Sequence, residues 1–126
     1  MSRLLLDTHV FLWCLSDVAR ISDLARSAIV DPRNQVFVSA ITGWEIQAKR
    51  AKGRLDAPEG LSTLVKKRGF THLPLEFRHA EEAARLPVLH RDPFDRFLVA
   101  QARVEGLTLV TRDRRVLQYD VPTMAI

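Results

Sequence analysis

Cysteine is almost absent from the sequence, and its scarcity excludes two kinds of protein. Cys14 is the only cysteine among the 126 residues, so the chain has neither an internal disulfide nor a cysteine-rich zinc module. The histidines at positions 9, 72, 79 and 90 have no zinc-binding spacing such as HExxH. A reducing cytoplasm is the location that such cysteine usage predicts.

Long hydrophobic runs are also missing. No apolar stretch approaches the roughly 18 residues that a membrane helix needs. The N-terminal MSRLLLDTHVFLWCL resembles a signal peptide, but Asp7 and His9 interrupt it and no small-residue cleavage site follows. A GxSxG motif and a glycine-rich nucleotide loop are absent as well. We therefore expect a soluble protein without a membrane partner.

Positive charge slightly exceeds negative charge. The sequence has 19 Lys and Arg against 15 Asp and Glu, a formal net charge of +4. The excess cations cluster at 49–54, 66–68 and 112–115, and such clusters attract a phosphate backbone. Solvated helix faces explain the first two clusters equally well. The third surrounds Asp113, which suits a site that holds a metal and an anionic substrate together.

Short apolar segments alternate with helical patterns along the whole chain. The length and composition fit one domain over residues 1–126, and the alternation predicts an α/β fold with a mainly parallel sheet. Strands are expected at 3–6, 35–38, 70–73, 107–110 and 122–125. Helices are expected at 8–15, 22–30, 39–52, 58–69, 76–86 and 93–106, with Pro58 in the first helical position, a turn at 87–92 and a helical turn at 113–117.

Four carboxylates stand where apolar segments end or turn inward. Asp7 closes RLLLD and Asp113 closes LTLVTRD, while Glu45 lies in SAITGWEI and Asp95 in DPFDRFLVAQA. Short apolar runs before an acid are typical of strands in a parallel sheet, and ligands collect beyond the carboxyl ends of such strands. Acids that lie so near one another favour a divalent cation among them. Ligands that are all oxygen atoms select Mg²⁺ or Mn²⁺.

Asp95 interrupts the apolar face of its predicted helix. Phe94, Leu98 and Val99 define that face, and Asp95 falls inside it. A carboxylate there loses solvation unless it is paired, protonated or bound to a cation. The structural alternative is an acid at the helix start that the macrodipole stabilises.

The other three acids have structural alternatives too. Asp7 or Asp113 alone would simply cap a following helix. Glu45 alone would form an exposed pair with Lys49 at i+4, worth only a few tenths of a kcal/mol. The functional interpretation depends on all four acids acting together.

The four segments occur in the order and spacing of one known family. LLLDTHVFLW, SAITGWEI, LHRDPFDRFLVAQA and LTLVTRD resemble the PIN-domain ribonucleases, and the resemblance to VapC-type toxins is close and covers essentially the whole chain. It implies a PIN-like three-layer α/β/α sandwich. It also places the family's acidic quartet on Asp7, Glu45, Asp95 and Asp113, with none of the four substituted.

The resemblance also implies an activity and partners. A VapC-type protein is the toxin of a type II toxin–antitoxin system and a Mg²⁺-dependent endoribonuclease, for which Mn²⁺ can substitute, leaving a 5′-phosphate and a 3′-hydroxyl. It is a homodimer, inhibited by a cognate antitoxin whose tail enters the acidic groove. Basic patches bind RNA phosphates without recognising the base sequence, so they do not identify the RNA target.

Further residues beside the quartet receive supporting roles. Asp92 is a candidate auxiliary acid, and the hydroxyls of Thr8, Ser39 and Thr111 are expected to orient the acids; alternatively each hydroxyl caps a helix or bonds to backbone. The candidates for holding the RNA backbone are Arg96, Arg112, Arg114 and Arg115.

Two other functions fit part of the pattern. LLLDTHV resembles the start of haloacid-dehalogenase-like phosphatases, but those need a second acid where this chain has His9. The other alternative is a PIN-like module that binds RNA or protein without cutting. The intact quartet argues against that module.

Overall fold

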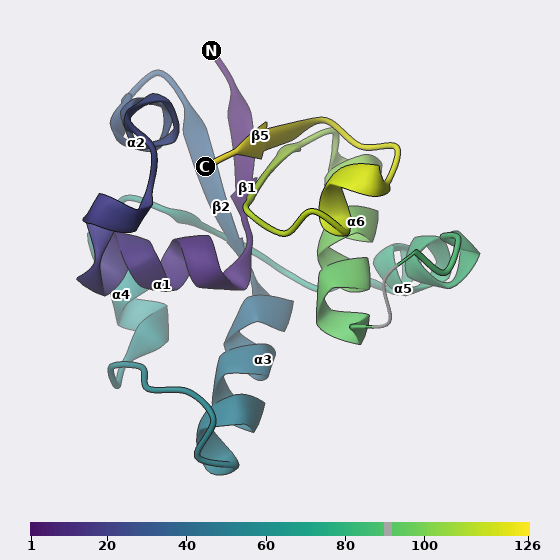
Figure 1. Ribbon diagram of the computed structural model, residues 1–126, viewed down its shortest axis with the longest axis horizontal. Coiled ribbons are helices and arrows are strands. Elements are labelled where there is room, and N and C mark those ends of the chain that lie inside the picture. The colour runs from purple at the N-terminus through teal and green to yellow at the C-terminus, as the bar shows by residue number, and fades with distance from the viewer. Residues whose placement is uncertain (90–91) are drawn as a thin grey trace.

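A five-stranded parallel sheet runs through the middle of the protein (Figure 1). The structure is a computed structural model that describes residues 1–89 and 92–126. The strand order is β3-β2-β1-β4-β5 and all four pairings are parallel, which confirms the predicted α/β fold. The strands are β1 (Arg3–Leu6), β2 (Gln35–Ser39), β3 (Thr71–Leu73), β4 (Thr108–Thr111) and β5 (Thr123–Ala125).

Helices cover both faces of this sheet. Those in the described part of the chain are α1 (Thr8–Ser16), η1 (Val18–Arg20), α2 (Asp23–Val30), α3 (Ala40–Ala51), α4 (Leu61–Lys67), α5 (Phe77–Arg85), α6 (Pro93–Glu105) and η2 (Val116–Gln118). Leu4 and Leu6 of β1 pack with side chains of α1, α2 and α4, whereas Leu5 packs with α5 and α6 on the other face. The predicted three layers are therefore present, as Figure 1 shows. None of the described helices has the length and apolarity to cross a bilayer.

Most predicted boundaries agree with the structure to within a residue or two. Ser22 caps α2 by accepting a hydrogen bond from the Ala25 amide, and Ser39 caps α3 through the Ile41 amide. Gly69 follows α4 with a φ of 76°, which ends that helix as predicted. The turn predicted at 87–92 includes positions 90 and 91, which lie outside the described residues.

The helix predicted from Pro58 is wrong in its start. α4 begins at Leu61, and Gly60 precedes it with a φ of 70° and a ψ of 39°. A left-handed residue cannot continue a right-handed helix, so the chain turns at this glycine instead. The helical turn predicted over 113–117 is present, since the amides of Val116 and Leu117 donate to the Asp113 carbonyl at 3.1 and 3.3 Å, and it continues into the 3-10 helix Val116–Gln118.

The carboxyl ends of β1, β2 and β4 lie at the same edge of the sheet. Asp7 follows β1, and its amide still donates to the Val110 carbonyl of β4 at 3.0 Å. Thr111 ends β4, and Ser39 ends β2 directly before α3. Residues that are distant in the sequence therefore meet at this edge.

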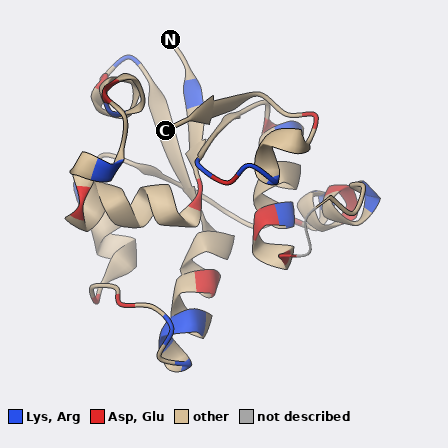
Figure 2. Cartoon of the chain, viewed as in Figure 1, with Lys and Arg blue, Asp and Glu red and all other residues tan. Residues whose placement is uncertain are grey.

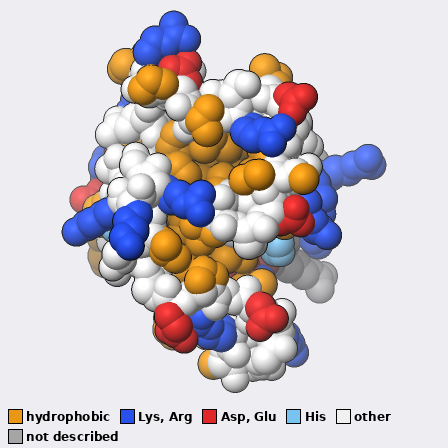
Figure 3. All heavy atoms as spheres, turned by 90° about the vertical axis from the view of Figure 1, so that its left-hand side faces the viewer, with side chains coloured by type: hydrophobic (Ala, Val, Ile, Leu, Met, Phe, Trp, Pro, Cys, Tyr) orange, Lys and Arg blue, Asp and Glu red, His pale blue; other side chains and the backbone are white. Residues whose placement is uncertain are grey.

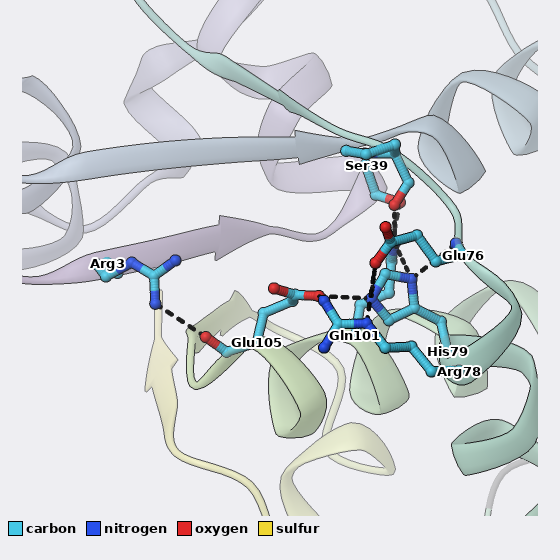
Figure 4. Close-up of polar contacts among 8 residues, drawn as sticks. Arg3, Ser39, Glu76, Arg78, His79, Gln101 and Glu105 are labelled. Carbon is cyan, nitrogen blue, oxygen red and sulfur yellow. Dashed lines mark hydrogen bonds and ion pairs between the residues drawn. The ribbon is translucent and has the colours of Figure 1, made fainter.

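A buried polar network fixes α5 against α6 and β2 (Figure 4). His79 is fully buried. Its Nδ1 accepts from the Glu76 amide at 2.9 Å, which leaves Nε2 to donate to Glu105 at 2.8 Å. Gln101 joins this histidine to the hydroxyl of Ser39. Among the described residues, no buried side-chain nitrogen or oxygen lacks a hydrogen-bond partner.

Arg96 of α6 binds the end of α5. Its guanidinium donates to the carbonyls of Ala83 at 2.8 Å, Leu86 at 3.2 Å and Pro87 at 3.0 Å. Carbonyls at the end of a helix have no intrahelical partner. Arg96 thus supplies donors that α5 cannot supply for itself.

Replacement of Arg96 should therefore weaken the fold. We expect Arg96→Met to lower the free energy of unfolding by about 1–3 kcal/mol, the usual effect of losing hydrogen bonds to a charged group, measured by urea denaturation. Arg85→Met on α5 is the control, because its side chain is 71% exposed, and it should change stability by less than about 0.5 kcal/mol. Equal effects of the two substitutions would contradict this role of Arg96.

Candidate metal centre

A pocket of about 320 Å³ opens at the carboxyl edge of the sheet. Its walls come from α1, α3, the start of α6 and the loop after β4, and Figure 2 shows acidic positions on these segments. The structure brings all four predicted acids into this one pocket: Asp7, Glu45, Asp95 and Asp113. The other lining residues are Thr8, His9, Trp13, Lys49, Asp92, Arg112 and Arg115.

Asp7 is held at both carboxylate oxygens. Oδ1 accepts from the Val10 amide at 2.9 Å and caps α1, and Oδ2 accepts from the Thr111 hydroxyl at 2.5 Å. Burial raises the pKa of the Asp7 carboxyl above its ordinary value, although the hydrogen bonds from Thr111 and Val10 oppose the rise. Asp7 is thus a helix cap and also a poorly solvated acid that a nearby cation would stabilise.

Glu45 is buried in the pocket wall. Only 2% of the residue is accessible. Oε1 accepts from the Thr8 hydroxyl at 2.5 Å, and Oε2 accepts from the Lys49 ammonium group. The i+4 pair with Lys49 is present, but the burial of Glu45 contradicts the exposed surface pair that the spacing suggests.

Two acids belong to the start of α6. Asp92 caps this helix by accepting from the Phe94 amide at 2.9 Å. Asp95 lies in the first turn, where the helix dipole favours negative charge. The helix dipole therefore stabilises Asp95, as the structural alternative predicts. The same position also makes Asp95 a lining residue of the pocket.

Thr111 connects Asp7 to the loop that carries Asp113. The Thr111 hydroxyl donates to Asp7 and accepts from the Asp113 amide at 3.0 Å. The Asp113 carboxylate accepts from the Arg115 amide at 2.8 Å. One hydroxyl thereby fixes the position of two acids.

The third predicted hydroxyl does not contact these acids. Ser39 donates to Gln101 and accepts from the Ile41 amide at 3.0 Å. Its position at the end of β2 turns it toward α6, so the role assigned to Ser39 is wrong. Thr8 and Thr111 do contact Glu45 and Asp7, respectively.

The predicted arginines divide into two groups. Arg112 and Arg115 line the pocket, and Arg115 lies 3.6 Å from the Asp113 carboxylate. Arg114 is exposed and is not among the lining residues. Arg96 is directed toward the end of α5 by the three carbonyls described above, so the structure does not place it for contact with RNA in the pocket.

Three lining residues were not predicted from the sequence: His9, Trp13 and Lys49. Three side chains surround the Trp13 ring. The guanidinium carbons of Arg112 and Arg20 lie 4.6 Å and 5.6 Å from the centroid of this ring. The centroid of the His9 ring lies 5.8 Å from the same point. The sequence signal for these residues is helical i+4 spacing, which puts Trp13 beside His9 and Lys49 beside Glu45.

The pocket acids share a cavity without forming a tight cluster. Only one group in the described parts of the chain offers three ligand atoms within 4.8 Å of one another, namely Glu76, His79 and Glu105. Arg78 donates to both of those glutamates (Figure 4), so it already supplies positive charge there. The wider spacing in the pocket suits an ion that keeps part of its water, as Mg²⁺ does. The carboxylate donor set also fits a hard divalent cation.

A second cavity of about 490 Å³ lies near α2, away from these acids. Its lining is mostly apolar and includes Cys14. Burial raises the pKa of the Cys14 thiol to about 11, so this cysteine is not a reactive thiolate at neutral pH. The acidic pocket is therefore the candidate functional site.

Comparison with known proteins identifies the family of this chain. The sequence model of the PIN domain matches residues 4–122. The chain belongs to the PIN-domain family. It is 31% identical to Ribonuclease VapC22 of Mycobacterium tuberculosis (strain ATCC 25618 / H37Rv), with 97% of this chain and 95% of the relative covered.

Solved structures confirm the PIN fold. VapBC2 from Rickettsia felis, bound to a DNA fragment from its promoter, matches with a TM-score of 0.72 at 14% identity and 98% coverage of both chains. FitAcB from Neisseria gonorrhoeae matches with a TM-score of 0.64 at 23% identity and 96% coverage of both chains. At these identities the likeness extends to the fold alone.

Neutralising Asp7 should stabilise the metal-free protein. Because burial raises its pKa, the ionised carboxylate destabilises the fold above the folded-state pKa, and the penalty vanishes below the unfolded pKa of about 3.9. We expect Asp7→Asn to raise the free energy of unfolding in EDTA by about 1 kcal/mol at pH 7 and to lose this gain toward pH 4.

The control for Asp7 is Asp56→Asn, since Asp56 is exposed and lies outside the pocket. It should leave the urea midpoint unchanged at both pH values. A lower midpoint for Asp7→Asn at pH 7 would show that the helix cap matters more than the buried charge.

Proposed function

We propose that this PIN-domain protein is the toxin of a type II toxin–antitoxin pair and a metal-dependent endoribonuclease. The observation that carries the proposal is the convergence of four carboxylates, from four separate segments, on one pocket. The ribonuclease name of the VapC22 relative supports it. Mg²⁺ is the proposed cofactor, with Mn²⁺ as substitute.

Asp7 and Asp95 are the proposed principal metal ligands, with Glu45 and Asp113 as further ligands and Asp92 as an auxiliary acid. A bound divalent cation supplies Lewis-acid chemistry, which activates water and offsets charge on the attacked phosphate. The threonine hydroxyls on Asp7 and Glu45 orient these carboxylates. Such orienting contacts tune a metal site.

The basic residues at the pocket mouth are the proposed phosphate contacts. Arg112 is held on the face of Trp13, which limits the rotamers of a long side chain before RNA arrives. Arg115 stands beside Asp113, and the exposed Arg114 extends the same basic loop. Together they offset the negative charge of an RNA backbone that would otherwise be repelled by the acids.

The proposed reaction is hydrolysis of an RNA phosphodiester. A water oxygen forms a bond to phosphorus while the bond from phosphorus to the 3′ oxygen breaks. The attacking water gives up one proton, the 3′ oxygen takes one proton and leaves as a hydroxyl, and the phosphate stays on the 5′ side of the next nucleotide. The acids in the pocket bind and position; none forms a covalent bond to the substrate.

The proposed partners are a cognate antitoxin and a second copy of this chain. The proposed location of the protein is the cytoplasm. The solved neighbours include VapBC complexes, and these support an antitoxin. Figure 3 shows apolar side chains gathered in the middle of one face, with basic groups around them. That face offers surface for protein contacts of this kind.

A PIN-like module that binds RNA without cutting it remains the second candidate function. It predicts RNA binding that survives loss of the acids. If the protein is a nuclease, RNA cleavage is lost when the acids are removed. One assay that measures both RNA binding and cleavage therefore distinguishes the two functions.

Cleavage should require both the metal and Asp7. We expect the purified protein to generate new 5′ ends in cellular RNA with Mg²⁺, and EDTA or Asp7→Asn to reduce the rate at least about a hundredfold, the size of effect expected for an essential catalytic group. Sequencing of the 5′ ends before and after incubation measures the rate and the cleavage site.

Asp56→Asn serves as the control and should cut at the wild-type rate. Cleavage that resists both EDTA and Asp7→Asn would exclude the metal mechanism. RNA binding with no cleavage under Mg²⁺ or Mn²⁺ would favour the binding module.

A further inference from the structure

A lysine already lies among the acids of the pocket. Lys49, one turn after Glu45 on α3, bonds to the Glu45 carboxylate. Its ammonium group lies 6.0 Å from the centroid of the Phe94 ring, and it interacts electrostatically with Asp92 and Asp95. It therefore reaches from α3 toward the first turn of α6, across the space that the acids enclose.

The Glu45 side chain is almost inaccessible to water, so solvent contributes little to the stability of its charge. Its side chain is only 3% exposed, whereas that of Lys49 is 33% exposed. Thr8 takes one carboxylate oxygen and Lys49 takes the other. An exposed i+4 pair contributes a few tenths of a kcal/mol, but a buried carboxylate that loses its counter-charge is far more costly.

The charge of Lys49 is firmly maintained. Its ammonium group bonds directly to the buried Glu45 carboxylate, and an opposite charge in contact favours the charged form of an amine. The ammonium group is also at the end of a flexible four-carbon chain, so it can leave Glu45 for solvent without moving α3.

We propose that Lys49 is the internal counter-ion of the acidic pocket and competes with the divalent cation for Glu45. The inference rests on the proposed metal-dependent function, because it concerns the same pocket. With Lys49 on Glu45, the carboxylates are partly neutralised and the metal-free fold is stable. A divalent ion that binds the acids repels the ammonium group and displaces it from the Glu45 oxygen.

Lys49 is therefore a positioning residue whose removal has two effects of opposite sign. Without the lysine, the buried Glu45 loses the cation that contacts its carboxylate in the described part of the chain, so the metal-free protein should be less stable. The same change removes a competing positive charge, so the divalent ion should bind more tightly. A purely structural salt bridge would give only the first effect.

Lys49→Met tests this inference, because methionine preserves the length of the side chain without its charge. Titration calorimetry with MnCl₂ alone should give roughly tenfold tighter Mn²⁺ binding than wild type, within the usual range of coupling between two ligands. Thermal melting in EDTA should give a lower midpoint for the variant, and Mn²⁺ should raise that midpoint more than it raises the wild-type midpoint.

Lys52→Met is the matched control, since Lys52 follows α3, is exposed and lies outside the pocket. It makes the same change in net charge and should leave both measurements at wild-type values. Lys49→Arg keeps the charge and should keep the wild-type affinity for Mn²⁺. Lys49→Gln is the second neutral variant, in case Lys49→Met does not fold.

Three results would overturn the proposal. Mn²⁺ affinity in the neutral Lys49 variants could equal that of Lys52→Met, which would leave the lysine without influence on the ion. It could fall, which would make Lys49 a support for the metal ligands. Tighter binding with an unchanged melting midpoint in EDTA would exclude the counter-ion role in the metal-free protein.

Failure of the nuclease proposal gives a different pattern. If wild type binds no Mn²⁺, or if Asp7→Asn binds it as tightly as wild type, the pocket is not the metal site and both proposals fail. If Asp7→Asn abolishes Mn²⁺ binding but the Lys49 variants match Lys52→Met, only the counter-ion proposal fails.

Discussion

Poorly solvated negative charge at the carboxyl edge of the sheet is the constraint on which the rest of the structure depends. Asp7 and Glu45 are both buried, and burial penalises an ionised carboxylate unless hydrogen bonds or a cation compensate. Thr111 and Thr8 each donate to one of these acids, and Lys49 brings a positive charge to the second. β1 and β4 end at this edge with Asp7, Thr111 and Asp113, and α3 adds Glu45 and Lys49 to the pocket.

Much of the fold could be predicted because strand period and helix capping are local properties of the sequence. The three leucines before Asp7 are all buried, as in a central strand, and Ser22 and Ser39 mark helix starts by their own side-chain chemistry. The start of α4 was not predictable in this way. Pro58 followed by an acidic residue resembles a first helical turn, and only the backbone of Gly60 shows that the helix begins later.

The site was predictable where an acid violates the local pattern, and unpredictable where side-chain direction decides the role. Asp95 was found because it lies within an apolar face. Arg96 is next to it in the sequence, but 100° of helical rotation directs it to the end of α5. Ser39 similarly faces α6. The sequence predicts Lys49 only as a surface partner of Glu45, because the burial of Glu45 arises from the packing of the assembled layers.

The hydrogen bond from Thr111 to Asp7 spans 104 positions of the chain, since β1 pairs with β4 in the centre of the sheet. The pocket therefore cannot form until β4 and the loop that carries Asp113 have been synthesised. A chain still emerging from the ribosome has Asp7 but neither Thr111 nor Asp113. Chain order thus delays assembly of the acidic pocket until the segment that carries Thr111 and Asp113 has left the ribosome.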